Sequence, residues 1–108
     1  MTAGEVEDVI RSQVADAAGV QSHGMTLESA LILPQEISVI FRTVENGRVR
    51  DEKIQVWLVG QEMVSDGYRI VMRNDGSQFG LVSSGFPADR HPILVGWYGS
   101  LVATFLAM

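Results

Sequence analysis

The hydrophobic positions in the first part of the chain recur at the spacing of an α-helix. Between residues 4 and 18 the apolar side chains return every three or four positions, which places them along one stripe. Acidic residues stand in the first turn, where the helix dipole favours negative charge, and Gly19 is a suitable C-terminal stop. We therefore predict a helix over residues 4–18, with a buried stripe of Val6, Val9, Ile10, Val14 and Ala17.

The next apolar run, residues 25–33, fits two interpretations. A helical turn capped by Thr26 fits its first half. The sequence Ala-Leu-Ile-Leu in its second half fits a buried strand equally well. We expect a short helix or loop that passes into an extended segment, and we expect Pro34 to end it.

From residue 36 onward the hydrophobic positions alternate, as they do in a half-buried strand. Asn46-Gly47 follows, a strong hairpin signal because both residues tolerate a positive φ. A second strand is predicted over residues 48–60, and its charged residues 51–53 should project beyond the core because nothing apolar accompanies them. The two faces of this strand are expected to carry Ile54, Val56 and Leu58 on one side and Gln55, Trp57 and Val59 on the other.

Two further turn signals complete an antiparallel meander. Residues 65–67 and 74–77 are rich in the Asp, Asn, Ser and Gly residues that favour tight turns. They bound a third strand over residues 68–73 and a fourth that ends near Ser83. Gly80, inside the fourth strand, indicates a bulge or a close backbone approach.

Beyond Arg90 the chain carries no charged residue up to Met108. Pro92 suits the first turn of a helix, with His91 or Asp89 as its cap, and we predict a helix from there to near Met108. Its bulky residues would cover the sheet. Its small residues would form a ridge that lets a second backbone approach closely, and the ridge consists of Gly99, Ala103 and Ala107.

These elements predict a single α+β domain over residues 1–108. It has an N-terminal helix, a four-stranded antiparallel meander and an apolar C-terminal helix packed on the sheet. The terminal helix could lie in the core or cover the sheet with one face and meet a second subunit with the other. A membrane span would need roughly 20 apolar residues, more than this segment has, so we expect no membrane partner.

Composition and charge narrow the classes of function. Hydrophobic residues make up 46% of the chain, which argues against disorder. The net charge is −5, and the eight lysines and arginines are scattered, so we expect no nucleic-acid binding. The chain has no cysteine, which excludes thiolate catalysis, and its acidic start lacks the pattern of a secretory signal. We expect a cytoplasmic protein.

Few residues suggest chemistry. The two histidines, His23 and His91, show no metal-motif spacing, and neither a nucleophile elbow nor a phosphate loop is present. We therefore expect no metal and no cofactor. A cleft between sheet and terminal helix would set polar groups against aromatic walls, as ligand sites do. Its candidate ligand-binding residues are Trp57, Glu62, Phe86, Asp89, Arg90, His91, Trp97 and Tyr98.

The function predicted from these features is assembly. We expect a small accessory or interaction protein, homodimeric through its C-terminal helix, with no enzymatic activity of its own. The alternative is a small-molecule-binding domain or a small acid–base enzyme with a pocket between sheet and helix. A third interpretation is a peptide-binding scaffold that uses residues 37–41 as an exposed sheet edge.

Overall fold

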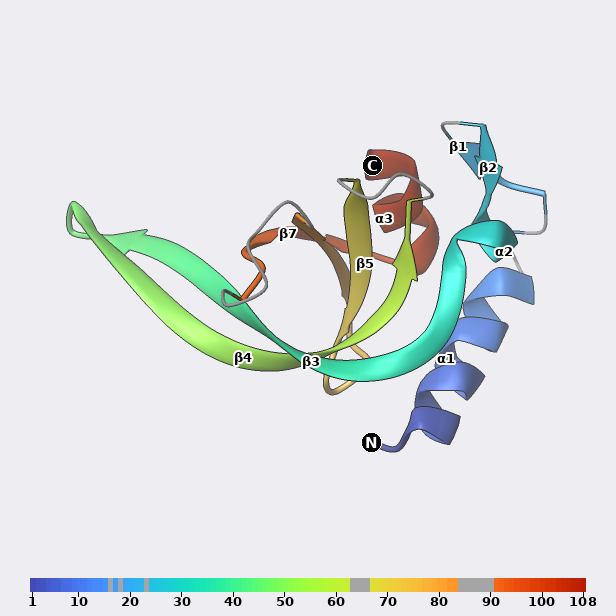
Figure 1. The fold of residues 1–108 in the computed structure, drawn as a ribbon, viewed down its shortest axis with the longest axis horizontal. Helices are drawn as coiled ribbons and strands as arrows, with labels where there is room; N and C mark the ends of the chain where they lie inside the picture. The colour runs from blue at the N-terminus through green and yellow to red at the C-terminus, as the bar shows by residue number, and fades with distance from the viewer. Residues whose placement is uncertain (16, 18, 23, 63–66, 84–90) are drawn as a thin grey trace.

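The computed structural model describes residues 1–15, 17, 19–22, 24–62, 67–83 and 91–108 (Figure 1). The fold is α+β, with a helix at each end and an antiparallel sheet between them, as the sequence predicts. The elements in chain order are α1 (Ala3–Ala15), β1 (Gln21–Ser22), β2 (Met25–Thr26), α2 (Leu27–Ala30), β3 (Leu31–Glu45), β4 (Arg48–Gln61), β5 (Tyr68–Arg73), β6 (Phe79–Ser83), β7 (Leu94–Gly99) and α3 (Leu101–Ala107).

The main sheet has five strands in the part of the chain that the structure describes, not four. Its order is β3-β4-β5-β6-β7, and each strand pairs antiparallel with the next one along the chain. The added strand, β7, occupies the segment for which a helix was predicted. The prediction of a C-terminal helix that starts at Pro92 is therefore wrong, because α3 begins only at Leu101. Ser100 caps this helix, and its side chain accepts a hydrogen bond from the N–H of Ala103.

Two β-bulges in β7 explain why the hydrophobic pattern did not predict a strand there. Its pairing with β6 skips Val95 and Tyr98, so each is an extra residue opposite the partner strand. Strict alternation is therefore lost, and the apolar run resembles a helix. Gly99, with φ +86°, ends the strand in a conformation that side chains with a Cβ rarely adopt.

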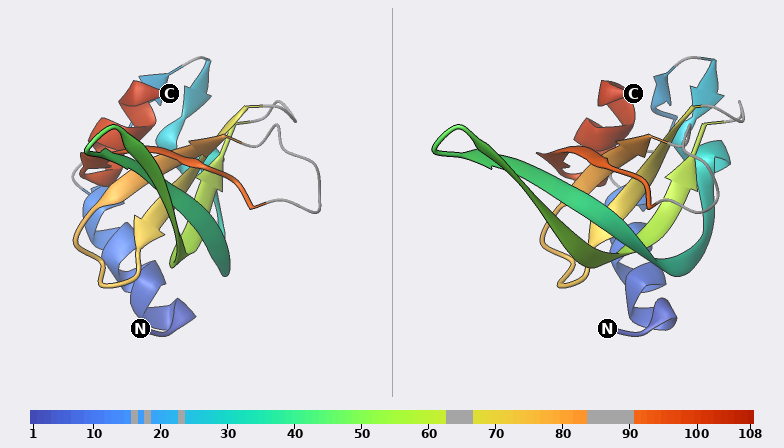
Figure 2. Two further views of the ribbon diagram at one scale, coloured as in Figure 1. Left: turned by 90° about the vertical axis from the view of Figure 1, so that its left-hand side faces the viewer. Right: turned by 60° about the vertical axis from the view of Figure 1, so that its left-hand side comes forward.

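One face of the sheet is covered by the two longer helices. Val6 and Ile10 of α1 and Leu101 and Phe105 of α3 are buried in one cluster with the inward-facing residues of β4, β5 and β6. The burial of the predicted stripe is confirmed, because Val9, Val14 and Ala17 also belong to this cluster or pack against it. The helix was predicted over residues 4–18, whereas α1 ends at Ala15 and Ala17 lies beyond it. Figure 2 shows both helices on the same side of the curled sheet.

The other face is buried by the curvature of the sheet itself. Val39, Val56, Leu58, Val71 and Val82 form a second cluster with Leu94. The predicted faces of β4 are confirmed, since Trp57 and Val59 belong to the first cluster and Val56 and Leu58 to the second.

The sheet curls until its first strand reaches the entry to its last. The N–H of Ile40 donates to the carbonyl of Pro92 at 2.9 Å, and Ile40 forms a parallel bridge with Ile93. Pro92 therefore does not open a helix, and His91 caps none. Asp89 lies outside the described residues.

Residues 25–33 combine both interpretations of that segment. Thr26 caps the single turn of α2, and β3 begins immediately afterwards at Leu31. The prediction that Pro34 ends the segment is wrong, because β3 runs through it. Because proline lacks an N–H, the pairing with β4 is instead interrupted between Leu31 and Gln35, and the strand continues beyond it.

Candidate functional site

The structure places the two tryptophans of the predicted ligand site on opposite faces of the sheet. Trp57 is buried under the helices, and its indole N–H donates to the side-chain oxygen of Asn74 at 3.1 Å. Trp97 is half-buried against the second cluster. The guanidinium of Arg73 lies 5.8 Å from the centre of its ring, a cation–π arrangement. The two rings therefore do not line a common cleft.

The other predicted ligand residues are also dispersed. Glu62 exchanges hydrogen bonds with the backbone of Tyr68 at the start of β5, which is a local strand-end contact. His91 is exposed, and Tyr98 is exposed at a bulge of β7. Phe86, Asp89 and Arg90 lie outside the described residues.

The predicted interface ridge does not form a line along a helix. Gly99 is the last residue of β7, whereas Ala103 and Ala107 lie in α3. Both alanines are exposed in the single chain.

The most distinctive surface is a two-stranded arm, residues 41–55, which projects from the sheet (Figure 1). Asn46 and Gly47 form its turn, with φ of 50° and 76°, the geometry that the hairpin signal predicts. The strands pair in register from Phe41 and Glu52 to Glu45 and Arg48.

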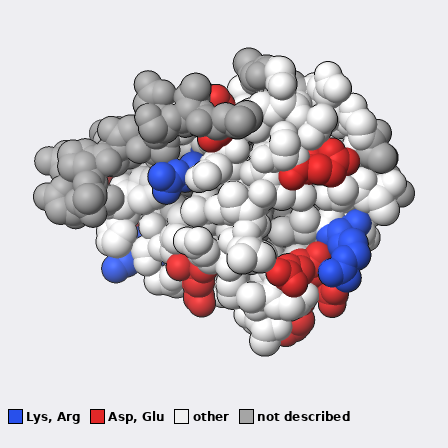
Figure 3. Space-filling model, turned by 45° about the vertical axis from the view of Figure 1, so that its right-hand side comes forward, with Lys and Arg blue, Asp and Glu red and all other residues white. Residues whose placement is uncertain are grey.

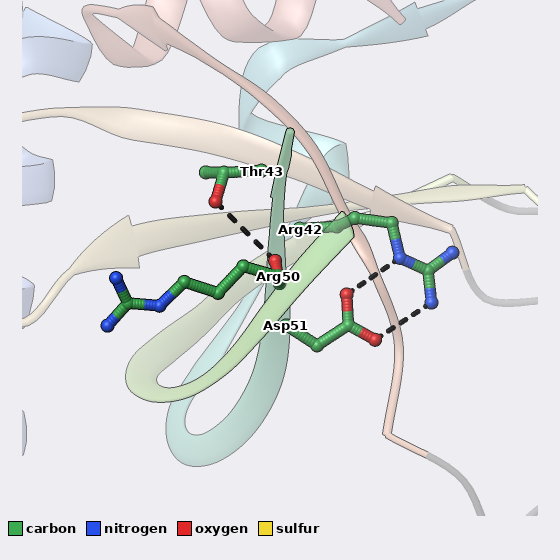
Figure 4. A network of polar contacts seen from close by, with 4 residues as sticks. All are labelled: Arg42, Thr43, Arg50 and Asp51. Atoms are coloured by element: carbon green, nitrogen blue, oxygen red, sulfur yellow. Dashed lines mark hydrogen bonds and ion pairs between the residues drawn. The ribbon is translucent and has the colours of Figure 1, made fainter. Parts of the chain in front are cut away.

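A bidentate ion pair bridges the two strands of the arm. The Nε and Nη2 atoms of Arg42 donate to the two carboxylate oxygens of Asp51 at 2.8 and 3.0 Å (Figure 4). Hydrogen bonding from Arg42 holds the pKa of Asp51 below its usual range, and the same bond raises the pKa of Arg42. Thr43 and Arg50 extend to the other side of the ribbon.

The tip of the arm exposes a pair of valines. Val44 and Val49 lie directly opposite each other across the two strands, and their exposures are 70% and 64%. Among the described residues, the arm strands pair only with each other: β5 joins β4 from Val56 onward, and β3 meets β7 no further out than Ile40. The arm thus offers exposed apolar side chains and free backbone edges together.

Two of the grooves on the described surface are candidate binding sites. The first, about 470 Å³, lies at the base of the arm and contains Trp97 and Arg73. Its other lining residues are Phe41, Glu52, Ile54, Gln55, Asn74 and Asp75. The second, about 560 Å³, is the α1 groove between α1 and the start of β3. Ile10 and Val14 line one wall, residues 31–34 line the other, and Glu7 and Arg11 stand at the rim.

The sequence contained a signal for the arm that our predictions used only in part. The hairpin turn and the projection of residues 51–53 were predicted, and both are confirmed. Val44 and Val49 were not singled out as functional. They flank the turn symmetrically, Val44 between Thr43 and Glu45 and Val49 between Arg48 and Arg50, and they have no apolar neighbour within the same strands near the turn. That pattern identifies them in retrospect.

In the described part of the chain, no three acidic or histidine side chains lie together as metal ligands would, and no described helix is long and apolar enough to cross a membrane. No protein family model matches the chain, and no curated protein or solved structure is significantly similar to it.

Proposed function

We propose that the chain is an accessory protein that acts by binding another protein chain through its arm, rather than by catalysis. The observation that carries this proposal is the exposed pair Val44 and Val49 at the tip of a projecting ribbon. Exposed apolar side chains gathered on one surface commonly mark interaction sites.

The backbone of the arm supports the same proposal. A two-stranded hairpin on its own is marginally stable in water, and unpaired strand edges are templates for pairing with another chain. Within this ribbon the Arg42–Asp51 ion pair adds a side-chain link between the two strands. A partner that pairs with either edge would supply backbone hydrogen bonds, and the valines would supply apolar contact.

A photo-crosslinking experiment in producing cells tests the proposal. A benzophenone-bearing amino acid replaces Val44 in one variant and Glu28, an exposed residue of α2, in a matched control. We expect a discrete protein adduct from position 44, none from position 28, and loss of the first when Val49→Asp is added. Absence of an adduct at position 44, or an adduct indifferent to Val49→Asp, would contradict the proposal.

A second candidate function is binding of a small zwitterionic molecule in the groove at the base of the arm. The stacking of Arg73 on Trp97 favours it, together with the Glu52 and Asp75 carboxylates on the same groove. A molecule with both an amino and a carboxylate group would match these charges, and the volume is within the usual range for ligand sites. Quenching of Trp97 fluorescence by such a ligand, abolished in Arg73→Ala, is the expected sign.

A further inference from the structure

We propose that the partner of the arm is a second copy of this chain, and that Val44 and Val49 of one copy dock in the α1 groove of the other. This inference rests on the proposed function, since it names the partner of the same arm. It differs from the predicted dimer, because neither Ala103 nor Ala107 takes part.

The α1 groove has the chemistry that the arm tip requires. Its walls are apolar, and its volume of about 560 Å³ can accept two valine side chains. Leu33, on the outer wall, is 77% exposed, the largest exposure among the exposed large hydrophobic residues. Burying Leu33 against the two valines would remove three of the most exposed apolar side chains from water at once.

The charges of the two surfaces are complementary. Residues 43–50 at the tip carry two arginines against one glutamate. The charged residues that line the α1 groove are Glu7 and Arg11. Because Arg11 forms an ion pair with Asp8 at 3.2 Å, Glu7 is the charge left to meet the arginines of the tip. Figure 3 shows the face turned toward the right of Figure 1, where acidic groups and some basic groups stand around a wide uncharged area. Opposite charges of this kind steer two surfaces together and set their register.

The shape of the molecule excludes the arm of the same chain as the occupant of the groove. The molecule is 42 Å long, and the arm and α1 lie toward opposite ends of it (Figure 1). The arm therefore cannot fold back into its own groove. A two-fold axis perpendicular to the long axis would bring each arm to the groove of the other copy, so both contacts form together and the assembly closes as a dimer.

Disulfide trapping between two purified variants tests this docking. Because the chain has no native cysteine, only the introduced thiols can form a disulfide. Val44→Cys on a tagged chain is mixed with Leu33→Cys on an untagged chain, under mild oxidation. The matched control replaces the second variant with Leu106→Cys, whose side chain is also exposed but lies on α3. A disulfide requires the two Cα atoms to come within about 7 Å.

We expect the mixed disulfide with Leu33→Cys to exceed that with Leu106→Cys at least tenfold, and we expect Val49→Asp on the tagged chain to abolish the difference. Equal yields in the two mixtures would overturn the inference. If yields are equal but the crosslinker at position 44 still captures a different protein in a Val49-dependent way, the proposed function stands and only the identity of the partner is wrong. If neither experiment gives a specific product, both are wrong.

Discussion

Gly80 is the residue at which the packing of the sheet permits no side chain. A Cβ added there would lie 2.5 Å from the carbonyl oxygen of Gly96 and 2.8 Å from the ring of Trp97. We expect Gly80→Ala to reduce the free energy of unfolding by about 1–3 kcal/mol, because β6 and β7 would have to separate. Urea denaturation measures the change.

Gly96→Ala is the matched control on the facing strand. A Cβ at Gly96 would meet only the ring of Tyr98, at 3.6 Å or more, which is ordinary contact. We expect its effect to stay within about 0.5 kcal/mol. Equal stability of the two variants would show that the close approach of β6 and β7 is misplaced.

Asp51 gives the arm a dependence on pH. Because its pKa is lowered by Arg42 in the folded chain, the ion pair contributes fully above the ordinary Asp pKa of about 3.9. The contribution is lost as the pH falls through the lower, folded pKa. Titration of the Asp51 carboxyl by NMR should give a pKa below that value, and Arg42→Gln should restore it. An ordinary pKa for Asp51 in the unmodified chain would contradict the pairing.

At the scale of elements, a side-chain hydrogen bond joins the two longer helices in addition to their apolar packing. The N–H of Leu101, in the first turn of α3, donates to the side-chain oxygen of Gln13 in α1 at 2.7 Å. We expect Gln13→Ala to reduce the free energy of unfolding by about 1–3 kcal/mol, since a part-buried donor loses its acceptor. Gln13→Glu keeps an oxygen acceptor, and a carboxylate is favourable at a helix N-terminus. In urea denaturation it should retain most of the stability. If Gln13→Ala unfolds at the same urea concentration as the unmodified chain, the hydrogen bond between Gln13 and Leu101 contributes nothing to the free energy of unfolding.

The elements also show what the sequence could predict. Helix α1, the hairpin turn and the alternation in β4 follow directly from local periodicity and turn chemistry, and all three are confirmed. Strand β7 could not be identified in this way, because its two bulges interrupt the alternation and its pairing with β6 is a tertiary contact. The Gln13–Leu101 bond joins residues far apart in the chain, so no local pattern indicates it.

The candidate site was predicted less well than the fold, for a related reason. The ligand residues were assembled on the assumption that a helix lies across the sheet after Pro92. With a strand there instead, Trp97 faces the second cluster and Trp57 the first. The turn of the arm was predicted from its own sequence, but the length of the arm depends on tertiary pairing, since β5 joins β4 only from Val56 and the entry to β7 meets β3 at Ile40.

At the scale of the whole molecule, the central claim is that the arm, and not α3, joins two copies of the chain. Light scattering after size exclusion tests it on the unmodified chain and two variants, Val44→Asp and Ala103→Asp. Both substitutions place a charge on a residue that is exposed in the single chain, so each variant should remain folded.

We expect about twice the 11.8 kDa chain mass for the unmodified protein and for Ala103→Asp, and the single-chain mass for Val44→Asp. A single-chain mass for the unmodified protein at micromolar concentration would contradict the claim. So would a dimer that Ala103→Asp dissociates and Val44→Asp leaves intact, which would return the interface to α3.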